Sequence, residues 1–159
     1  MSVHEKTPSA SHVEMTELVL PNHTNQLGNL LGGQLMHWID ICAALSAAKN
    51  SQRVCVTASV DRIDFLHPIK LGNAVTLIAS VNRVFNSSME VGVKVFAESL
   101  IEGKKVHSNT AFLTFVSVDE NGNPVKAIES VPETDDEKRR YDEALQRREK
   151  RLQNRIKTN

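Results

Sequence analysis

The feature that most constrains this chain is an apolar segment from Gly33 to Lys49 that contains no proline and no internal glycine. Its apolar residues recur in nearly every direction around a 3.6-residue spiral, which predicts a long helix buried on most sides. Asp40 is the one acidic residue of this segment. Since an ionised carboxylate is rarely buried without partners, Asp40 either pairs with a neighbouring polar group or takes part in chemistry.

A glycine-rich loop precedes this helix. Gly28, Gly32 and Gly33 permit positive φ and close backbone approach, and the helix is expected to begin where they end. The first backbone N–H groups of a helix stabilise negative charge. With a rise of about 1.5 Å per residue, Asp40 lies roughly 10 Å beyond the glycines, so one helix cannot bring both to one atom. Across a twofold dimer, the helix start of one copy can face Asp40 of the other.

Strand-forming sequence surrounds the helix. A first strand is expected before Pro21, and β-branched residues predict further strands over 53–65, 74–85, 89–99 and 105–118. The connectors at 68–73, 86–88 and 102–104 are typical of hairpins, so the last strands should form an antiparallel meander. We therefore predict the α+β class, with a single hotdog domain in which a curved antiparallel sheet wraps a long central helix. Pairing two such sheets would cover a free edge strand, which favours a homodimer.

The two ends of the chain differ from this domain in composition. Residues 1–11 are predicted to be a disordered arm, residues 12–131 the domain, and residues 132–159 a charged helical tail. Acids at 135–137 precede the bases, as the helix dipole favours. Because its apolar stripe is thin, we expect this helix to lie on the domain or on a neighbour, with its basic residues forming a solvated face.

Composition excludes several classes of function. The formal net charge is +0 with 24% charged residues, which gives no electrostatic footprint for nucleic acid or an anionic membrane. No apolar run approaches the about 18 residues of a membrane span, and the first residues do not resemble a signal peptide, so we expect a cytoplasmic protein without membrane insertion. Cys42 and Cys55 lack the spacing of a zinc site or redox pair and are expected to be buried free thiols.

Residue types near Asp40 leave other chemistries open. His37 lies three positions before Asp40 and could touch it. The pair lacks a third metal ligand, and Ser46 lies inside the helix rather than in a nucleophile elbow, so neither a metal site nor a serine triad is predicted. A partly buried histidine with a structural role is the simpler interpretation of His37. A hydratase or dehydratase would use His37 together with Asp40.

An ordered set of residues resembles a known family. The set is Asn25-x-x-Gly28-x-x-x-Gly32-Gly33, then Asp40, then Asp64-Phe65-x-x-Pro68-Ile69-x-x-Gly72. It is similar to the hotdog acyl-CoA thioesterases of the brain acyl-CoA hydrolase type and their short bacterial relatives, and the likeness runs from about residue 15 to residue 118. The resemblance implies hydrolysis of fatty acyl-CoA to free acid and CoA, without a cofactor, by Asn25 and Asp40 from opposite hotdogs. Such relatives are commonly trimers of dimers, which implies a hexamer.

The residue types suit this chemistry. Asp40, ionised at neutral pH, could activate water or attack the thioester directly, and the Gly33 amide, with Gly32 and Gln34, could stabilise the oxyanion. Asn25 could orient water or the thioester carbonyl, or could form an Asx turn in its loop. For the CoA arm, Ser87 and Ser88 are expected contacts by resemblance, and Arg62, Arg83 and Lys94 could meet phosphates. The alternative is a non-catalytic acyl-CoA-binding or regulatory module that uses the same cleft.

Overall fold

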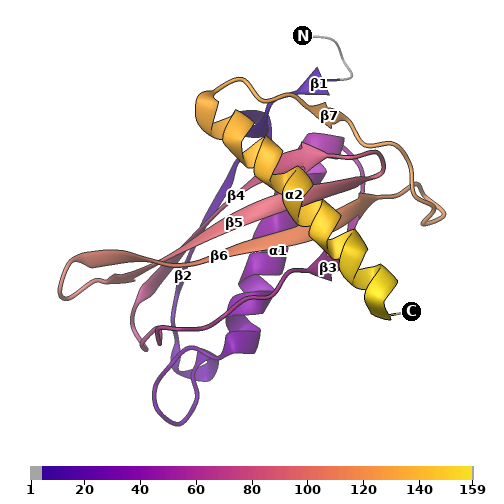
Figure 1. Ribbon diagram of the computed structural model, residues 1–159. Coiled ribbons are helices and arrows are strands. Elements are labelled where there is room, and N and C mark those ends of the chain that lie inside the picture. The colour runs from indigo at the N-terminus through magenta and orange to yellow at the C-terminus, as the bar shows by residue number, and fades with distance from the viewer. Residues whose placement is uncertain (1–4, 159) are drawn as a thin grey trace.

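The computed structural model describes residues 5–158 and has the predicted hotdog architecture (Figure 1). Helix α1 (Gly32–Ser51) packs on one face of a five-stranded antiparallel sheet, and helix α2 (Asp135–Thr158) crosses the other face. The strand order is β2-β4-β5-β6-β3. The bounds are β2 Val13–Leu18, β3 Cys55–Val60, β4 Ala74–Val84, β5 Ser88–Ser99 and β6 Lys104–Ser117. The predicted first strand, hairpin meander and tail helix are all confirmed.

The core lies between α1 and the inner face of the sheet. Alternating residues of the long central strands are fully buried, as in the run Val91, Val93 and Val95 of β5. They pack with the buried face of α1, which includes Leu35, Trp38, Ile39, Cys42, Ala43 and Ala47. Buried residues recur every second position along β5 and every three to four positions along α1. Each element therefore has one apolar face, and the two faces pack in the same layer.

Strand β3 is shorter than expected and forms one edge of the sheet. The prediction of a strand over 53–65 holds only for Cys55–Val60, which pairs with β6 and has a register shift between Thr57 and Ser59. The Asp61 amide still donates to the Phe112 carbonyl of β6, and the residues that follow leave the sheet as a connector. This connector runs to the start of α1.

The expectation that α1 is buried on most sides is wrong for one stripe of the single chain. Ile41 and Leu45 are 38% and 48% exposed, whereas Ile39 and Cys42 are completely buried. Val56 and Val60 of the edge strand β3 are also exposed. Both the helix and the edge strand therefore leave apolar side chains exposed in the single chain.

The disordered arm predicted over residues 1–11 is also wrong where it can be compared. Residues 1–4 lie outside the described residues, but β1 (Glu5–Lys6) pairs with β7 (Glu129–Ser130), and a 3₁₀ helix spans Pro8–Ser11. Buried Ser11 accepts a hydrogen bond from the Val81 amide at 2.8 Å, and its carbonyl accepts one from the Ser46 hydroxyl at 2.7 Å. Non-local pairing therefore orders a segment whose own sequence is polar. A second 3₁₀ helix, Pro21–His23, precedes the glycine loop.

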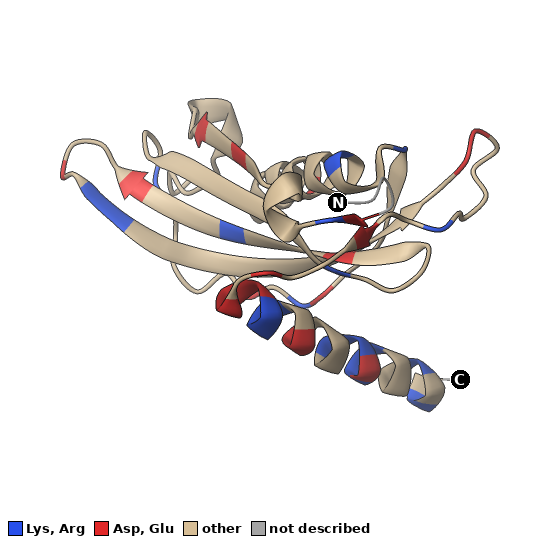
Figure 2. Cartoon of the chain, turned by 90° about the horizontal axis from the view of Figure 1, so that it is seen from above, with Lys and Arg blue, Asp and Glu red and all other residues tan. Residues whose placement is uncertain are grey.

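Helix α2 lies on the sheet, but its basic residues do not form a simple solvated face. Figure 2 shows acidic residues at the start of α2 and basic positions, with some acidic ones between them, along the rest of the helix. Arg147 binds Glu90 of β5 at 2.6 Å and stacks over the Phe112 ring at 3.7 Å. Glu90 is completely buried, so the outer face of the sheet requires a cation from the helix that covers it.

Candidate active site

The loop before α1 fixes the carboxamide of Asn25. Its Oδ1 accepts hydrogen bonds from the amides of Leu27 at 2.9 Å and Asn29 at 3.2 Å. Gly28, with φ +73°, closes the loop by donating its amide to the Asn25 carbonyl at 3.0 Å. The side-chain oxygen of Asn25 therefore forms the predicted Asx turn with the backbone of its own loop. The Nδ2 hydrogens are the part of this side chain that can be offered to a substrate.

The start of α1 presents backbone donors. Leu31 precedes the helix in an extended conformation and gives it no side-chain cap. Its carbonyl accepts hydrogen bonds from the Gln34 and Leu35 amides, both at 3.1 Å. The predicted use of the Gln34 amide therefore competes with a bond inside the helix. Gly32 and Gly33, as the first helical residues, have no carbonyl one turn earlier in the helix and are the better candidates for an oxyanion.

The connector after β3 covers this helix start. The Phe65 ring packs against the helix start, where a Cβ added to Gly32 would lie in ordinary contact with it at 3.5 Å. The Asn109 side chain holds the connector by donating Nδ2 to the Asp64 carbonyl at 2.7 Å. A cavity of about 270 Å³ opens here, lined by Asn29, Leu30, Gly32, Leu35, Phe65, His67, Pro68, Ile69 and Asn109. The glycine loop before α1 and the connector after β3 therefore line one cavity.

Asp40 lies along α1 at the side that faces β3. Its carboxylate is partly buried, and Oδ1 accepts a hydrogen bond from the Thr57 hydroxyl at 2.7 Å. Thr57 was not predicted, because only the packing of β3 against α1 brings the two side chains together. His37 is exposed rather than partly buried, and the described residues show no hydrogen bond between it and Asp40. The geometry therefore favours Asp40 with Thr57 over Asp40 with His37.

One chain does not bring all the predicted catalytic residues together. Asp40 follows Gly33 by seven positions in the same continuous helix, which corresponds to about 10 Å along its axis. The Asn25 loop lies at the start of that helix. The chain thus carries two separate half-sites, one with Asn25 and the helix amides and one with Asp40 and Thr57.

The predicted CoA contacts have partners within the chain. The Arg62 side chain is 86% exposed and its Nε lies 3.0 Å from Asp64. Arg83 stacks on the Tyr141 ring of α2 at 3.8 Å and donates to the Tyr141 carbonyl. Ser88 accepts a hydrogen bond from Arg148 of α2 at 3.2 Å, and Ser87 precedes it in the β4–β5 hairpin. Arg83 and Ser88 are therefore tied to α2 rather than to the helix start.

Other reactive groups fit a structural role better. Burial raises the pKa of the Cys42 thiol to about 11, although a backbone hydrogen bond involving Ala79 opposes the shift. Burial also raises the pKa of the half-buried Cys55 thiol, so neither cysteine is a thiolate at neutral pH. Within residues 5–158, His, Cys, Asp and Glu side chains form no cluster of three or more suited to a metal ion.

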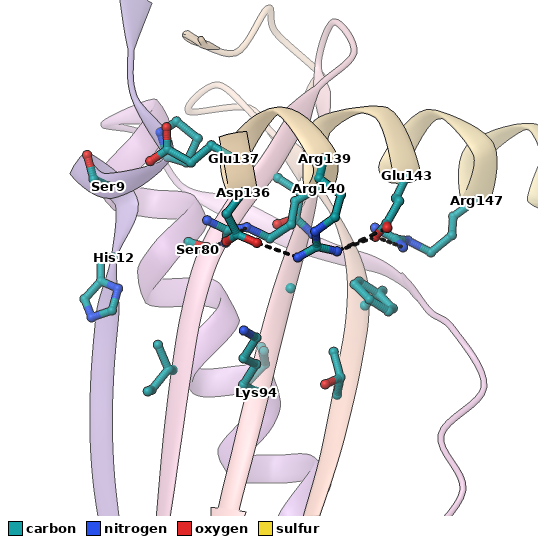
Figure 3. Close-up of a pocket in the computed structure, with 17 residues that line it drawn as sticks. Ser9, His12, Ser80, Lys94, Asp136, Glu137, Arg139, Arg140, Glu143 and Arg147 are labelled. Carbon is teal, nitrogen blue, oxygen red and sulfur yellow. Dashed lines mark hydrogen bonds and ion pairs between the residues drawn. The ribbon is translucent and has the colours of Figure 1, made fainter. Parts of the chain in front are cut away.

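A cavity of about 410 Å³ lies beneath α2, on the side of the sheet away from α1. Figure 3 shows its acidic and basic side chains paired along the helix, with Arg139 2.6 Å from Asp136 and 3.0 Å from Glu143. The hydrogen bond from Arg139 lowers the pKa of Asp136 below its usual range. Because these charges neutralise one another away from Asp40, this cavity is a poor candidate for the catalytic centre.

Known proteins provide a decisive comparison. The model of the thioesterase superfamily matches residues 27–104. An uncharacterised acyl-CoA thioester hydrolase of Bacillus subtilis is 45% identical over 89% of this chain and 82% of its own length. Acyl-coenzyme A thioesterase 11 of mouse is 44% identical over 96% of this chain, which spans only 25% of that protein. The chain belongs to the hotdog acyl-CoA thioesterase family.

Solved structures of this family have the same fold. The acyl-CoA hydrolase of Staphylococcus aureus, in complex with butyryl coenzyme A, coenzyme A and coenzyme A disulfide, aligns with a TM-score of 0.89 and 38% identity, covering 97% of this chain and 94% of its own. Its alanine variants replace an Asn, an Asp and a Thr that follow one another at spacings of fifteen and seventeen positions. A hexameric acyl-CoA thioesterase is 38% identical with a TM-score of 0.91, covering 96% of this chain and 97% of its own. Neither helix described in the present chain is long and apolar enough to cross a membrane.

Proposed function

We propose that this chain hydrolyses acyl-CoA to a free acid and CoA, with Asp40 as the catalytic carboxylate. The observation that carries the proposal is the hydrogen bond of 2.7 Å from Thr57 to Asp40. Asn25, Asp40 and Thr57 also follow one another at the same spacings, fifteen and seventeen positions, as the three residues replaced in the S. aureus enzyme. Thr57 orients one carboxylate oxygen of Asp40 and leaves the other free to accept a proton.

In the general-base route, Asp40 takes a proton from a water molecule as the water oxygen attacks the thioester carbonyl carbon. The resulting tetrahedral oxyanion is stabilised by the Gly32 and Gly33 amides and by Nδ2 of Asn25. Losing one such donor typically costs about 3 kcal/mol. The carbon–sulfur bond then breaks, the carbonyl reforms, and the proton on Asp40 passes to the departing CoA thiolate.

In the nucleophilic route, the free oxygen of Asp40 attacks the same carbon and expels CoA thiolate. Water then opens the mixed anhydride and restores Asp40. Label in the Asp40 carboxylate after a single turnover in ¹⁸O-labelled water identifies the nucleophilic route, because attack of water on the aspartyl carbonyl of the anhydride places it there. The general-base route leaves Asp40 unlabelled.

The two half-sites are joined in a homodimer, which we place at the exposed side of α1 and β3. Ile41 and Leu45 leave apolar surface exposed on α1, and β3 is a sheet edge that exposes Val56 and Val60; such an edge is a natural template for pairing with a second copy. A twofold axis here sets the Asp40 of one protomer opposite its partner's helix start. Three such dimers would give the hexamer known in a structural neighbour.

The proposal is tested by Asp40→Asn and Asn25→Ala, assayed for release of free CoA from acyl-CoAs of different chain lengths. We expect kcat to fall by about 10² to 10⁴ in the Asp40 variant, because the proton acceptor is lost. His37→Ala is the matched control on the exposed side of the same helix and should keep its activity.

Full activity in the Asp40 variant would contradict the proposal. Tight binding of acyl-CoA by the wild-type chain without turnover would indicate the binding module instead. Hydration of an enoyl-CoA that depends on both His37 and Asp40 would indicate the hydratase.

A further inference from the structure

A second cavity, of about 200 Å³, lies between the C-terminal half of α2 and the outer face of the sheet near β3. It is lined by arginines, hydroxyl side chains and apolar groups: Ala58, Ser59, Phe85, Ser88, Thr114, Val116, Arg148, Arg151, Leu152 and Arg155. The three arginines recur at spacings of three and four along α2 and so share one side of the helix. No carboxylate is among these lining residues.

The surrounding carboxylates are already matched by other charges. Glu90 binds Arg147 at 2.6 Å and Arg151 at 3.3 Å, and Asp61 binds Arg151 at 2.9 Å. These two acids and two arginines balance one another. The charges of Arg148 and Arg155, which lie one turn to either side of Arg151, are additional to that balance. Like charges at such spacings destabilise a helix, and a bound anion would relieve the repulsion.

The surroundings of Arg148 favour an oxygen-rich anion. Its guanidinium stacks over the Phe85 ring at 4.3 Å and donates Nη1 to the Ser88 hydroxyl at 3.2 Å. This contact uses the Ser88 oxygen as acceptor and leaves its hydrogen free to donate. The Thr114 hydroxyl is buried and has no hydrogen-bond partner among the described residues. The cavity therefore offers guanidinium and hydroxyl donors together.

We propose that this cavity is a phosphate-binding subsite formed by Arg148, Arg155 and the hydroxyls of Ser88 and Thr114. A guanidinium matches a phosphate with two parallel hydrogen bonds, and neighbouring hydroxyls bind the remaining oxygens. The phosphate can belong to the nucleotide end of acyl-CoA, which rests on the proposed function, or to a separate phosphorylated ligand. Both sources require the same contacts.

Binding is tested on the full chain by calorimetric titration with adenosine 3′,5′-bisphosphate and with inorganic pyrophosphate. The test variant is Arg148→Ala combined with Arg155→Ala, and Lys150→Ala with Lys157→Ala is the control that removes the same charge from exposed positions of α2. We expect at least a tenfold loss of affinity in the arginine variant and none in the lysine control. Absence of binding to the wild type, or equal affinity in all three proteins, would overturn the proposal. Circular dichroism verifies that each variant is folded.

A kinetic comparison identifies the source of the phosphate. If it belongs to the substrate, the arginine variant raises the ratio of KM for acyl-CoA to KM for the corresponding S-acyl-pantetheine about tenfold, since the latter lacks phosphate. If it belongs to a separate ligand, that ratio stays constant and any effect of added pyrophosphate on the rate is lost in the variant. Because the titration requires no turnover, the loss of the proposed hydrolase function would leave the phosphate proposal separately testable.

Discussion

The contact between Thr57 and Asp40 illustrates how one hydroxyl can fix the orientation of a carboxylate that we propose to be catalytic. Asp40 lies on a rigid helix and Thr57 on an edge strand, so the hydrogen bond of 2.7 Å fixes the side-chain torsions of Asp40. One oxygen is bound and the other is left for the reaction. A water molecule held at that second oxygen would have a defined direction of attack, which is what positioning contributes to rate.

Thr57→Val tests this role, because valine keeps the shape of threonine and removes the donor. Hydrogen bonds to charged groups contribute about 1.5 to 3 kcal/mol, so we expect kcat to fall by roughly 10- to 100-fold, with a smaller change in KM. Thr57→Ser restores the hydroxyl and should recover most of the rate. The measurement is steady-state release of CoA. Equal rates for the valine and serine variants would show that the hydroxyl does not position Asp40.

At the scale of elements, α2 is attached to the sheet through the buried carboxylate of Glu90. Arg147 binds it with Nε and Nη2, Arg151 lies at 3.3 Å, and the Asn82 amide donates to it at 3.0 Å. Asn82 can reach Glu90 only because Gly92 has no side chain, since a Cβ there would lie 2.8 Å from Asn82 Nδ2. The helix therefore supplies the positive charge that this strand requires.

Removing both guanidiniums with Arg147→Ala and Arg151→Ala should lower the free energy of unfolding by about 3 to 5 kcal/mol, because a buried charge is left without its cations. Adding Glu90→Leu removes that charge and should recover most of the loss. Arg139→Ala breaks only exposed ion pairs and should cost less than about 1 kcal/mol. Urea unfolding at one protein concentration measures all three. A leucine variant as unstable as the double alanine variant would contradict the role of Glu90.

An element could be predicted where its own residues specify it, and could not where contacts with distant residues do. The strands 74–84, 88–99 and 104–117 follow from β-branched runs and turns within each hairpin, and α1 follows from its own apolar pattern. The segment 5–11 was missed because its order depends on Ser11 meeting Val81, seventy positions away. The position of Arg147 opposite Glu90 likewise depends on the packing of α2.

The residues of the candidate site also differ in whether neighbouring sequence or distant packing specifies them. Asn25, Gly33 and Asp40 were predicted from the resemblance of a continuous stretch of sequence to a family motif, and their roles stay predictions. Thr57 could not be predicted, since a threonine in a strand is ordinary until its neighbour across the helix–sheet interface is known. The engagement of the Gln34 amide by Leu31 depends on how the first turn of α1 closes, which composition does not specify.

At the scale of the whole molecule, the exposed side of α1 supports the proposed dimer. Ile41 and Leu45 would remain in contact with water in a monomer, and the edge strand β3 also exposes Val56 and Val60. A second copy that covers this surface would complete the burial expected for an apolar helix. The same association would join the half-site of Asn25 to that of Asp40, so stability and catalysis would depend on one interface.

A shared site makes a prediction that a self-contained site does not. Asn25→Ala and Asp40→Asn should each be inactive alone, but a dimer formed from one copy of each contains one site in which both residues are intact. If equal amounts are unfolded together and refolded, half of the dimers are mixed and half of their sites are active, so about a quarter of wild-type activity should return. Each variant refolded alone is the control, and mass photometry measures assembly. A mixture as inactive as its components, at full assembly, would place Asn25 and Asp40 in the same protomer's site.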